Sequence, residues 1–401
     1  MKILRRVFNS KKYLQIILLA ILIFLSINLI LNDYQHIKKK TYEVNDIVIG
    51  TVIEPEISKE SAFTELMRIK NAFSKILPQD PIQPNFCPEV PPKLNTQIKI
   101  EPIPDNFTAL DLDIKSFNFS NGLQNGGKWS PENCRARHKV AIVIPYKDRL
   151  HNLNYFMNHM HPFLQRQELE YQIFVVEQMN DDLFNKGVLM NSAFLEIRNI
   201  YNYTNPDLNS FPFDCIIYHD VDLLPEDDRI LYSCPSAKPR HLSVAIDKFK
   251  YKIFYYRLIG GVLNFKIYHF VKANGYSNEY WGWGGEDDDM EVRLTNLKIG
   301  YERPNINIAH YSMLKHEKRV KNPLRGQLLK KARTRLQKDG LNNVNYTLIE
   351  IKKYPMFTHI MIDVGRTPIE LIQVLNPQQK TTTINQSNVT TINSNSTKPN
   401  N

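Results

Sequence analysis

The sequence predicts an α/β fold in which a largely parallel sheet is covered by crossover helices. Three apolar runs support this fold: Val140 to Ile144, Tyr171 to Val176 and Cys215 to Tyr218. Each run has the β-branched and aromatic composition of a buried strand, and helical stretches separate the runs along the chain. Such an order favours parallel strands whose carboxyl ends meet at one edge of the sheet, where ligands usually bind.

The N-terminal part of the chain predicts a membrane anchor. Residues 13–31 form an uncharged, apolar run of 19 residues, about the length that a helix needs to span a bilayer. Lysines and arginines at 2, 5, 6, 11 and 12 favour a cytoplasmic tail over residues 1–12, although three lysines follow at 38–40. A cleaved signal peptide is the alternative, but no small-x-small cleavage site follows the run.

Two further segments flank the predicted domain, which we expect between residues 87 and 368. Residues 32–86 read as a stem, with apolar residues at helical spacing from Ser58 to Leu77 and Pro78 ending that helix. This helix could pair with a second copy to form a homodimer, or it could pack onto the main domain. Residues 369–401 are rich in Thr, Asn, Ser and Gln, which predicts a disordered tail.

Charge and cysteine content limit the class of protein. Lys and Arg number 51 against 41 Asp and Glu, yet no helix-turn-helix, zinc-finger or RNA-binding signature is present, so nucleic acid is not the expected partner. The surplus of positive charge suits a nucleotide diphosphate or an anionic membrane surface better. The four cysteines lack CxxC spacing and suit two disulfides in an oxidising compartment. Glycosylation sequons support a secretory location and occur at Asn106, Asn118, Asn202, Asn345, Asn385, Asn388 and Asn395.

The stretch from Trp281 to Asp289 reads WGWGGEDDD and is the most informative part of the sequence. Flat indole rings suit the apolar faces of sugars, and carboxylates can hold sugar hydroxyls or take a proton from one. The alternative is a solvated loop that caps the following helix with acidic residues. This stretch therefore indicates either a sugar site or a helix start.

A second acidic element, Asp220-Val-Asp222, directly follows an apolar strand. Residues two apart in an extended segment point the same way, so both carboxylates could face one Mg²⁺ or Mn²⁺ ion that bridges to a diphosphate. Met313 and His316 add a thioether and an imidazole, which shift the preference toward Mn²⁺. Taken one at a time, these residues have plainer interpretations: an acidic turn for Asp220-Val-Asp222, a packed core residue for Met313 and a surface residue for His316.

Nine basic residues lie between Lys315 and Arg335. Most of them are expected on a solvated helix. Arg325 follows the Asn322-Pro323 turn and could instead contact a phosphate.

Taken together, several strings of the chain resemble the β-1,4-galactosyltransferase family, which includes the invertebrate β-1,4-N-acetylgalactosaminyltransferases. The strings run in family order and are GGKWSPENC (126–134), HKVAIVIPYKDR (138–149), HPFLQRQ (161–167), FNKGVLMN (184–191), HDVDLLP (219–225), PRHLSVAIDKF (239–249), IGGV (259–262), GYSNEYWGWGGEDDD (275–289) and YPMFTHIMIDVG (354–365). The resemblance implies a single-pass type II Golgi membrane protein with a luminal GT-A catalytic domain. It also implies a Mn²⁺ requirement and inversion at the anomeric carbon of the transferred sugar.

By matching position, the resemblance implies a set of site residues. The nucleotide-sugar contacts are Pro145, Tyr146, Lys147, Asp148, Arg149, Phe184, Asn185, Lys186, Val221, Asp222, Leu258, Trp283 and His316. The metal ligands are Asp222, Met313 and His316, and the acceptor site comprises Gly285, Glu286, Asp287, Asp288 and Arg325. Asp287 is implied as the catalytic base, with Glu286 beside it, and the implied disulfides are Cys87–Cys134 and Cys215–Cys234.

Leu258 bears on the choice of donor. It stands two residues before Gly260, where vertebrate galactosyltransferases have tyrosine and the invertebrate enzymes that resemble this chain have an aliphatic residue. A leucine leaves more room for a donor acetamido group, although Leu258 could also be ordinary packing. The sequence thus predicts transfer of N-acetylgalactosamine from UDP-GalNAc to O4 of terminal β-linked N-acetylglucosamine on glycoproteins or glycolipids. UDP-galactose as donor is the alternative, and a sugar-binding membrane protein without turnover is the alternative from another class.

Overall fold

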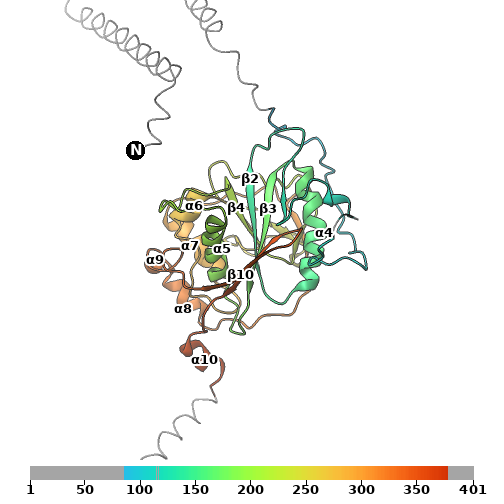
Figure 1. Cartoon of the computed structure of the whole chain (residues 1–401). Coiled ribbons are helices and arrows are strands. Elements are labelled where there is room, and N and C mark those ends of the chain that lie inside the picture. Colours follow the sequence, from blue (N-terminus) through green and yellow to red (C-terminus); the bar gives the residue numbers. More distant parts are fainter. Residues whose placement is uncertain (1–84, 114, 116, 378–401) are drawn as a thin grey trace, which may run out of the picture. The chain divides into compact units, whose positions relative to one another are not determined.

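The computed structural model describes residues 85–113, 115 and 117–377 (Figure 1). The predicted cytoplasmic tail, membrane anchor and nearly all of the predicted stem, including its helix, lie outside these residues. Within the part of the chain that the structure describes, no helix combines the length and the apolar character needed to span a bilayer.

An 8-stranded mixed sheet forms the centre of the domain, with strand order β10-β11-β3-β2-β4-β8-β6 and β1 paired to β3. The strands are β1 (Lys128–Trp129), β2 (Lys139–Tyr146), β3 (Glu170–Gln178), β4 (Cys215–His219), β6 (Arg240–His241), β8 (Val262–Lys266), β10 (Thr347–Lys353) and β11 (Thr358–Asp363). The prediction of three buried strands at β2, β3 and β4 is confirmed. Strands β11, β3, β2 and β4 run parallel, whereas β1, β6, β8 and β10 pair antiparallel, so the sheet is parallel only at its centre.

Helices α4 (Leu150–Arg166) and α5 (Lys186–Ile200) are the crossovers that connect β2 to β3 and β3 to β4. They cover opposite faces of the sheet (Figure 1). Successive residues of β2 point to opposite sides, so this strand contributes side chains to the cores under both helices. Ile142 packs with α4 in one core, and Val143 packs with α5 in the other. A strand buried on both faces explains the continuous apolar run in the sequence.

A small second sheet, with order β5-β9-β7, places two distant segments side by side. It consists of β5 (Leu223–Pro225), β9 (His310–Met313) and β7 (Ala245–Ile246). Strand β5 begins directly after Asp222 and pairs antiparallel with β9, so that Leu223 lies opposite Met313. This pairing brings two predicted metal ligands together although about ninety residues separate them in the chain.

The remaining elements are α6 (Ile267–Lys272), α7 (Glu286–Asn296), α8 (Arg325–Lys330), α9 (Ala332–Arg335), α10 (Ile369–Leu375), η1 (Asn118–Ser120) and η2 (Asp247–Phe249). Two of them differ from the prediction. Helix α7 begins at Glu286, so the four consecutive acidic residues form its first turn and do not precede it. Helix α10 occupies the start of the predicted disordered tail, because Leu371 is buried in the core beside β11; residues 378–401 lie outside the described part.

Two disulfides close the domain, Cys87–Cys134 and Cys215–Cys234. They are the pairs that the family resemblance implies. The second one joins β4 to the segment before β6, and Cys215 begins β4, at the opposite end of the strand from Asp220 and Asp222.

Candidate active site

The first turn of α7 lines a cavity of about 700 Å³, and all five predicted acceptor residues line it. Glu286, Asp287 and Asp288 all reach this cavity from the helix N-terminus, where the helix dipole favours negative charge. Gly285 precedes them with a φ of 108°, and a Cβ at this position would lie 2.5 Å from the ring of Tyr280. Only glycine therefore permits this helix start.

The fourth carboxylate of the run, Asp289, has a structural role. It is fully buried, and its oxygens accept from Arg293 Nε at 2.6 Å and from Arg335 Nη2 at 2.7 Å. Both arginines also reach Asp339, at 3.3 and 3.2 Å. This buried network ties α7 to α9 and holds the first turn of α7 in place beneath the cavity.

Lys186, at the start of α5, joins the two acidic motifs. Its Nζ lies 3.0 Å from Asp220, 3.4 Å from Glu286 and 3.4 Å from Asp287. Burial alone would lower the pKa of Lys186, but these three carboxylates raise it well above its ordinary value. The ammonium group is therefore a fixed positive charge between strand β4 and helix α7.

Asp287 is the carboxylate best placed to act on a ligand. Its side chain is 23% exposed and lines the cavity, and a Cβ on Gly260 would approach its Oδ2 to 2.3 Å. Burial raises the pKa of Asp287 to about 8, with Glu286 and Asp220 adding to the shift and Lys186 opposing it. A carboxylate whose pKa lies near neutrality can exchange a proton with a sugar hydroxyl.

Asp222, Met313 and His316 come together as the prediction required, and they fit a metal site. His316 Nε2 lies 2.8 Å from Asp222 Oδ2, and Met313 is brought beside them by the β5–β9 pairing. His316 Nδ1 hydrogen-bonds the carbonyl of Glu317 at 2.7 Å, which leaves Nε2 directed at Asp222. Two ligand atoms at this separation can share one octahedral ion with bonds of about 2.1 Å.

The two aspartates of Asp220-Val-Asp222 do not face one ion, contrary to the extended-strand argument. Strand β4 ends at His219 and the chain then turns, with Leu223 N donating to Asp220 O at 3.3 Å. The carboxylate of Asp220 consequently pairs with Lys186, whereas that of Asp222 meets His316. The alternation of side chains holds only while the backbone stays extended.

The predicted nucleotide segments lie at the carboxyl ends of β2 and β3, as expected. Lys147 Nζ is held by the carbonyls of Asn180 and Asp182, at 2.6 and 3.1 Å. Asn185 differs from the prediction of a ligand contact, because it is fully buried and its side chain caps α5 by accepting from Val188 N at 3.0 Å. It positions Phe184 and Lys186, which flank it.

The other members of these segments divide between core and surface. Pro145, Tyr146 and Val221 are buried at the strand ends, and Asp148 is exposed in a turn with a φ of 52°. Arg149 Nη1 lies 3.9 Å from Asp222 Oδ2, which places it at the predicted metal site.

Two backbone hydrogen bonds connect the Trp283 turn to the basic segment after His316. Trp283 N donates to Val320 O at 2.7 Å, and Asn322 N donates back to Trp283 O at 3.2 Å. The guanidinium of Arg325 lies 5.3 Å from the centre of the Trp283 ring. Leu258, Trp283 and Arg325 line the same cavity as Asp287. Two predicted donor residues, Leu258 and Trp283, therefore lie beside the acceptor residues, whereas the predicted metal ligands and the other nucleotide residues are not among those that line the cavity.

Sequence reasoning missed several residues of this site. Lys248 Nζ lies 3.3 Å from Met313 Sδ, and Tyr255 OH donates to Asp288 Oδ1 at 2.6 Å. Arg319 lies 4.2 Å from the centre of the Phe184 ring and donates to Lys147 O at 2.6 Å, and its burial lowers the pKa of its guanidinium to about 10. Of these residues, only Arg319 lies in the run of nine basic residues noted in the sequence, and the sequence does not indicate which of the nine points inward.

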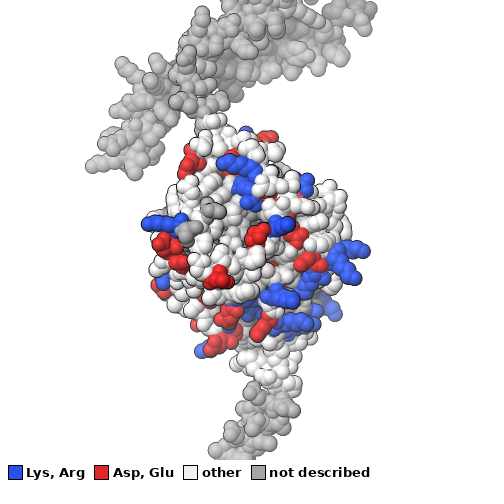
Figure 2. All heavy atoms as spheres, turned by 90° about the vertical axis from the view of Figure 1, so that its right-hand side faces the viewer, with Lys and Arg blue, Asp and Glu red and all other residues white. Residues whose placement is uncertain are grey.

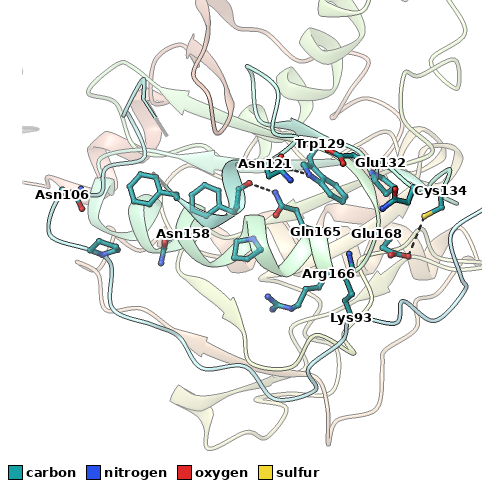
Figure 3. A pocket seen from close by; sticks show the side chains of 16 residues that line it. Lys93, Asn106, Asn121, Trp129, Glu132, Cys134, Asn158, Gln165, Arg166 and Glu168 are labelled. Atoms are coloured by element: carbon teal, nitrogen blue, oxygen red, sulfur yellow. Dashed lines mark hydrogen bonds between the residues drawn. The ribbon is translucent and has the colours of Figure 1, made fainter. Parts of the chain in front are cut away.

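A larger cavity of about 830 Å³ lies elsewhere, between α4 and the N-terminal segment (Figure 3). Its polar side chains serve the fold: Gln165 donates to Phe119 O at 2.8 Å, and Arg166 pairs with Asp228 at 3.0 Å. Apart from Cys134, which forms a disulfide, none of the predicted site residues lines it. The smaller cavity at α7 is therefore the candidate active site.

The surplus of basic residues is not spread evenly. On the face shown in Figure 2, Lys and Arg side chains gather toward one lower edge, whereas Asp and Glu are scattered. This distribution would attract anionic ligands to one side of the domain.

Comparison with known proteins identifies the family. The model for the N-terminal region of glycosyl transferase group 7 matches residues 87–235, and the model described as the N-terminal domain of galactosyltransferase matches residues 240–317. Mouse β-1,4-galactosyltransferase 2 is 37% identical over 295 residues, which cover 72% of this chain and 75% of that protein. Mouse β-1,4-galactosyltransferase 1 is 38% identical over 282 residues, covering 70% and 67%.

Among solved structures, the catalytic domain of Drosophila β-1,4-galactosyltransferase 7 in complex with xylobiose is 31% identical, with a TM-score of 0.48. The match covers 57% of this chain and 95% of the Drosophila chain. A mutant of the same enzyme has been solved with manganese, UDP-Gal and xylobiose. By its sequence relatives, the chain belongs to the β-1,4-galactosyltransferase family.

Proposed function

We propose that this protein is an inverting β-1,4-glycosyltransferase that moves a sugar from a UDP-sugar to O4 of a terminal β-linked N-acetylglucosamine. The observation that carries the proposal is the setting of Asp287, a partly exposed carboxylate that lines the cavity beside a fixed lysine. The names of its relatives favour galactose as the transferred sugar. A pure sugar-binding protein would need neither this base nor the metal set of Asp222, Met313 and His316.

In the proposed reaction, Asp287 accepts the proton of the acceptor hydroxyl as that oxygen attacks the anomeric carbon of the donor. General base catalysis of this kind contributes about 10²–10⁴-fold to a rate. Asp288, held by Tyr255 at 2.6 Å, orients the acceptor sugar, and Lys186 keeps the carboxylates of Asp287 and Glu286 in place. Direct displacement inverts the anomeric centre, so no covalent sugar–enzyme intermediate is required.

We further propose that Asp222, Met313 and His316 hold Mn²⁺. A thioether and an imidazole beside a carboxylate suit a transition ion better than Mg²⁺. The bound ion would supply positive charge to the diphosphate of the leaving UDP. Arg149, 3.9 Å from Asp222, belongs to one predicted nucleotide segment, and Arg319 lies over the ring of Phe184 in the other.

Replacement of His316 tests this metal assignment. His316→Ala should lower the affinity for Mn²⁺ at least about 10-fold, because one of three protein ligands is lost. Isothermal titration with MnCl₂ in the absence of any sugar measures this directly. His151→Ala, at an exposed histidine on α4, is the matched control and should bind Mn²⁺ like the wild type. Unchanged affinity in His316→Ala would remove His316 from the site.

UDP-GalNAc is the second candidate donor, and Leu258 is the observation that favours it. Leu258 lines the cavity with Asp287, where a smaller apolar side chain leaves room for an acetamido group. If it selects the donor, Leu258→Tyr should shift the ratio of kcat/KM for UDP-GalNAc over UDP-galactose toward galactose by roughly 10- to 200-fold, the range of a one-group difference in a pocket. Leu258→Ile should leave the ratio near its wild-type value. An unaltered ratio in Leu258→Tyr would mean that Leu258 is ordinary packing.

Membrane anchoring by residues 13–31 and a luminal Golgi location of the catalytic domain complete the proposal. The two disulfides are compatible with an oxidising compartment. The acceptor N-acetylglucosamine would be carried by glycoproteins or glycolipids of that compartment.

A further inference from the structure

Three polar side chains that do not line the cavity at α7 hold the backbone of residues 256–261 from within the domain. They are His241 and Ser243, which are fully buried, and Arg303, which is partly buried. The backbone that they hold carries Leu258 into the cavity. The proposed reaction gives these three side chains no task, yet most of their hydrogen bonds go to this one stretch of chain.

The carbonyl of Gly260 is the point where the contacts converge. His241 Nε2 donates to it at 2.9 Å, and Ser243 Oγ donates to it at 3.1 Å. Ser243 Oγ in turn accepts from Val262 N at 2.9 Å. Two side-chain donors occupy both lone pairs of the Gly260 carbonyl, so its peptide plane is held in one orientation.

Arg303 determines which nitrogen of His241 carries the proton. Its Nε donates to His241 Nδ1 at 3.2 Å, and its Nη2 donates to the carbonyls of Tyr256 and Leu258, each at 2.7 Å. A guanidinium only donates and a carbonyl only accepts, so His241 must carry its proton on Nε2, facing Gly260. Burial lowers the pKa of His241 to about 3, with Arg303 adding to the shift and the bond to Gly260 opposing it, so the ring is neutral at physiological pH.

Gly260 packs directly against Asp287, the proposed base. A Cβ on Gly260 would lie 2.3 Å from Asp287 Oδ2 and 2.9 Å from its Cγ. The next residue, Gly261, has a φ of 91°, and a Cβ there would lie 2.6 Å from Ser243 Oγ. The two glycines thus allow Asp287 and Ser243 to approach the same backbone closely. Because the contact at Gly260 is so close, the position of this backbone limits where the Asp287 carboxylate can lie.

We infer that His241 is a positioning residue for the base: through the carbonyl of Gly260 it keeps the carboxylate of Asp287 aligned with the acceptor hydroxyl. Arg303 supports this role by fixing the tautomer of His241, and Ser243 supports it as the second donor to the same carbonyl. This inference rests on the proposed function, in which Asp287 accepts the acceptor proton.

Two amide substitutions of His241 separate its two ring nitrogens. The amide nitrogen of glutamine can take the place of Nε2 and donate to Gly260 O, whereas the shorter asparagine reaches only the place of Nδ1. His241→Asn should lower kcat by about 10²-fold, the cost of misplacing a reacting group by about 1 Å, while the KM for the UDP-sugar stays nearly unchanged. His241→Gln should keep kcat within a few-fold of the wild type. A wild-type kcat in His241→Asn, or equal losses in both variants, would overturn the inference.

His161→Asn is the matched control for the loss of a buried imidazole. His161 is also fully buried, and its Nε2 and Nδ1 hydrogen-bond Met356 O and Tyr171 OH, each at 2.9 Å. It lies on α4 and does not line the cavity at α7. This variant should lower the free energy of unfolding, as His241→Asn does, but keep the wild-type kcat. A comparable fall of kcat in His161→Asn would reduce the effect at His241 to a general loss of stability.

A double-mutant cycle with Asp287→Asn is the decisive experiment, with single-turnover rates as the readout. If His241 acts through Asp287, His241→Asn should add no more than a few-fold loss once Asp287 is replaced. Ser243→Ala removes the second donor to Gly260 with a smaller change in volume, and it should show the same dependence on Asp287. The same fold loss with and without Asp287 would overturn the inference and leave the proposed function intact. A wild-type rate in Asp287→Asn alone would instead refute the proposed function, and the inference with it.

Discussion

Asp287→Asn should reduce sugar transfer by about 10²–10⁴-fold, the contribution of a general base, while binding of UDP and Mn²⁺ stays unchanged. Asparagine preserves the size of the side chain but cannot accept the acceptor proton. The fold should also be retained, because α7 is anchored by Asp289, which pairs with Arg293 and Arg335. Single-turnover assays combined with titration of UDP separate the loss of chemistry from a loss of binding.

Asp288→Asn is the matched control for this experiment. It alters the neighbouring carboxylate, which is held by Tyr255, and should mainly raise the KM for the acceptor, with a smaller effect on kcat. A rate for Asp287→Asn within a few-fold of the wild type would place the base elsewhere. Equal losses of kcat in both variants would mean that the acidic turn acts as one binding unit.

Lys186→Met should be the most damaging substitution of a residue outside α7. Removal of its charge leaves Asp220, Glu286 and Asp287 together without their shared partner, and the loss of a partner from this partly buried set should cost about 1–3 kcal/mol. The free energy of unfolding, measured by urea denaturation, should fall by that amount. Lys186→Arg retains the charge and should lose much less, although the planar guanidinium cannot reproduce all three contacts.

The same pair of variants tests how kcat/KM depends on pH. Asp287 must be ionised to act as a base, and its pKa is raised to about 8, so kcat/KM should rise with pH around that value and not near the ordinary range of a carboxyl group. Lys186 lowers the pKa of Asp287, so its removal should move this rise to higher pH, whereas Lys186→Arg should leave it nearly in place. A rise that stays fixed in Lys186→Met would contradict the assigned coupling.

The sequence predicted the centre of the fold well. Buried parallel strands are continuous apolar runs, which made β2, β3 and β4 visible, and the disulfide pairs followed from the family resemblance. The sheet edges were missed because β6 has only two residues, and because strand direction in β8 depends on tertiary pairing. The α10 helix was missed because residues 369–401 were judged as one segment: α10 reads IELIQVL and is largely apolar, whereas the residues after it are rich in Thr, Asn, Ser and Gln.

Site residues could be predicted from the sequence where a single motif contains the reactive groups. Asp287 and His316 were expected from their motifs; Asp287 lines the cavity at α7, and His316 Nε2 lies 2.8 Å from Asp222 Oδ2. The role of Lys186 was not predictable, since its three carboxylate partners lie 34, 100 and 101 residues further along the chain and meet it only in the folded domain. Asp220 was misjudged because the chain turns immediately after β4.

The central claim is that this chain builds a β-1,4 bond onto terminal N-acetylglucosamine, and product analysis tests it most directly. Protein should be incubated with Mn²⁺, a β-linked N-acetylglucosaminide and either UDP-galactose or UDP-GalNAc, and the product examined by proton NMR. The account predicts one new β-linked residue on O4, formed by the wild type and essentially absent with Asp287→Asn. No product with either donor, or a product linked elsewhere than O4, would contradict it.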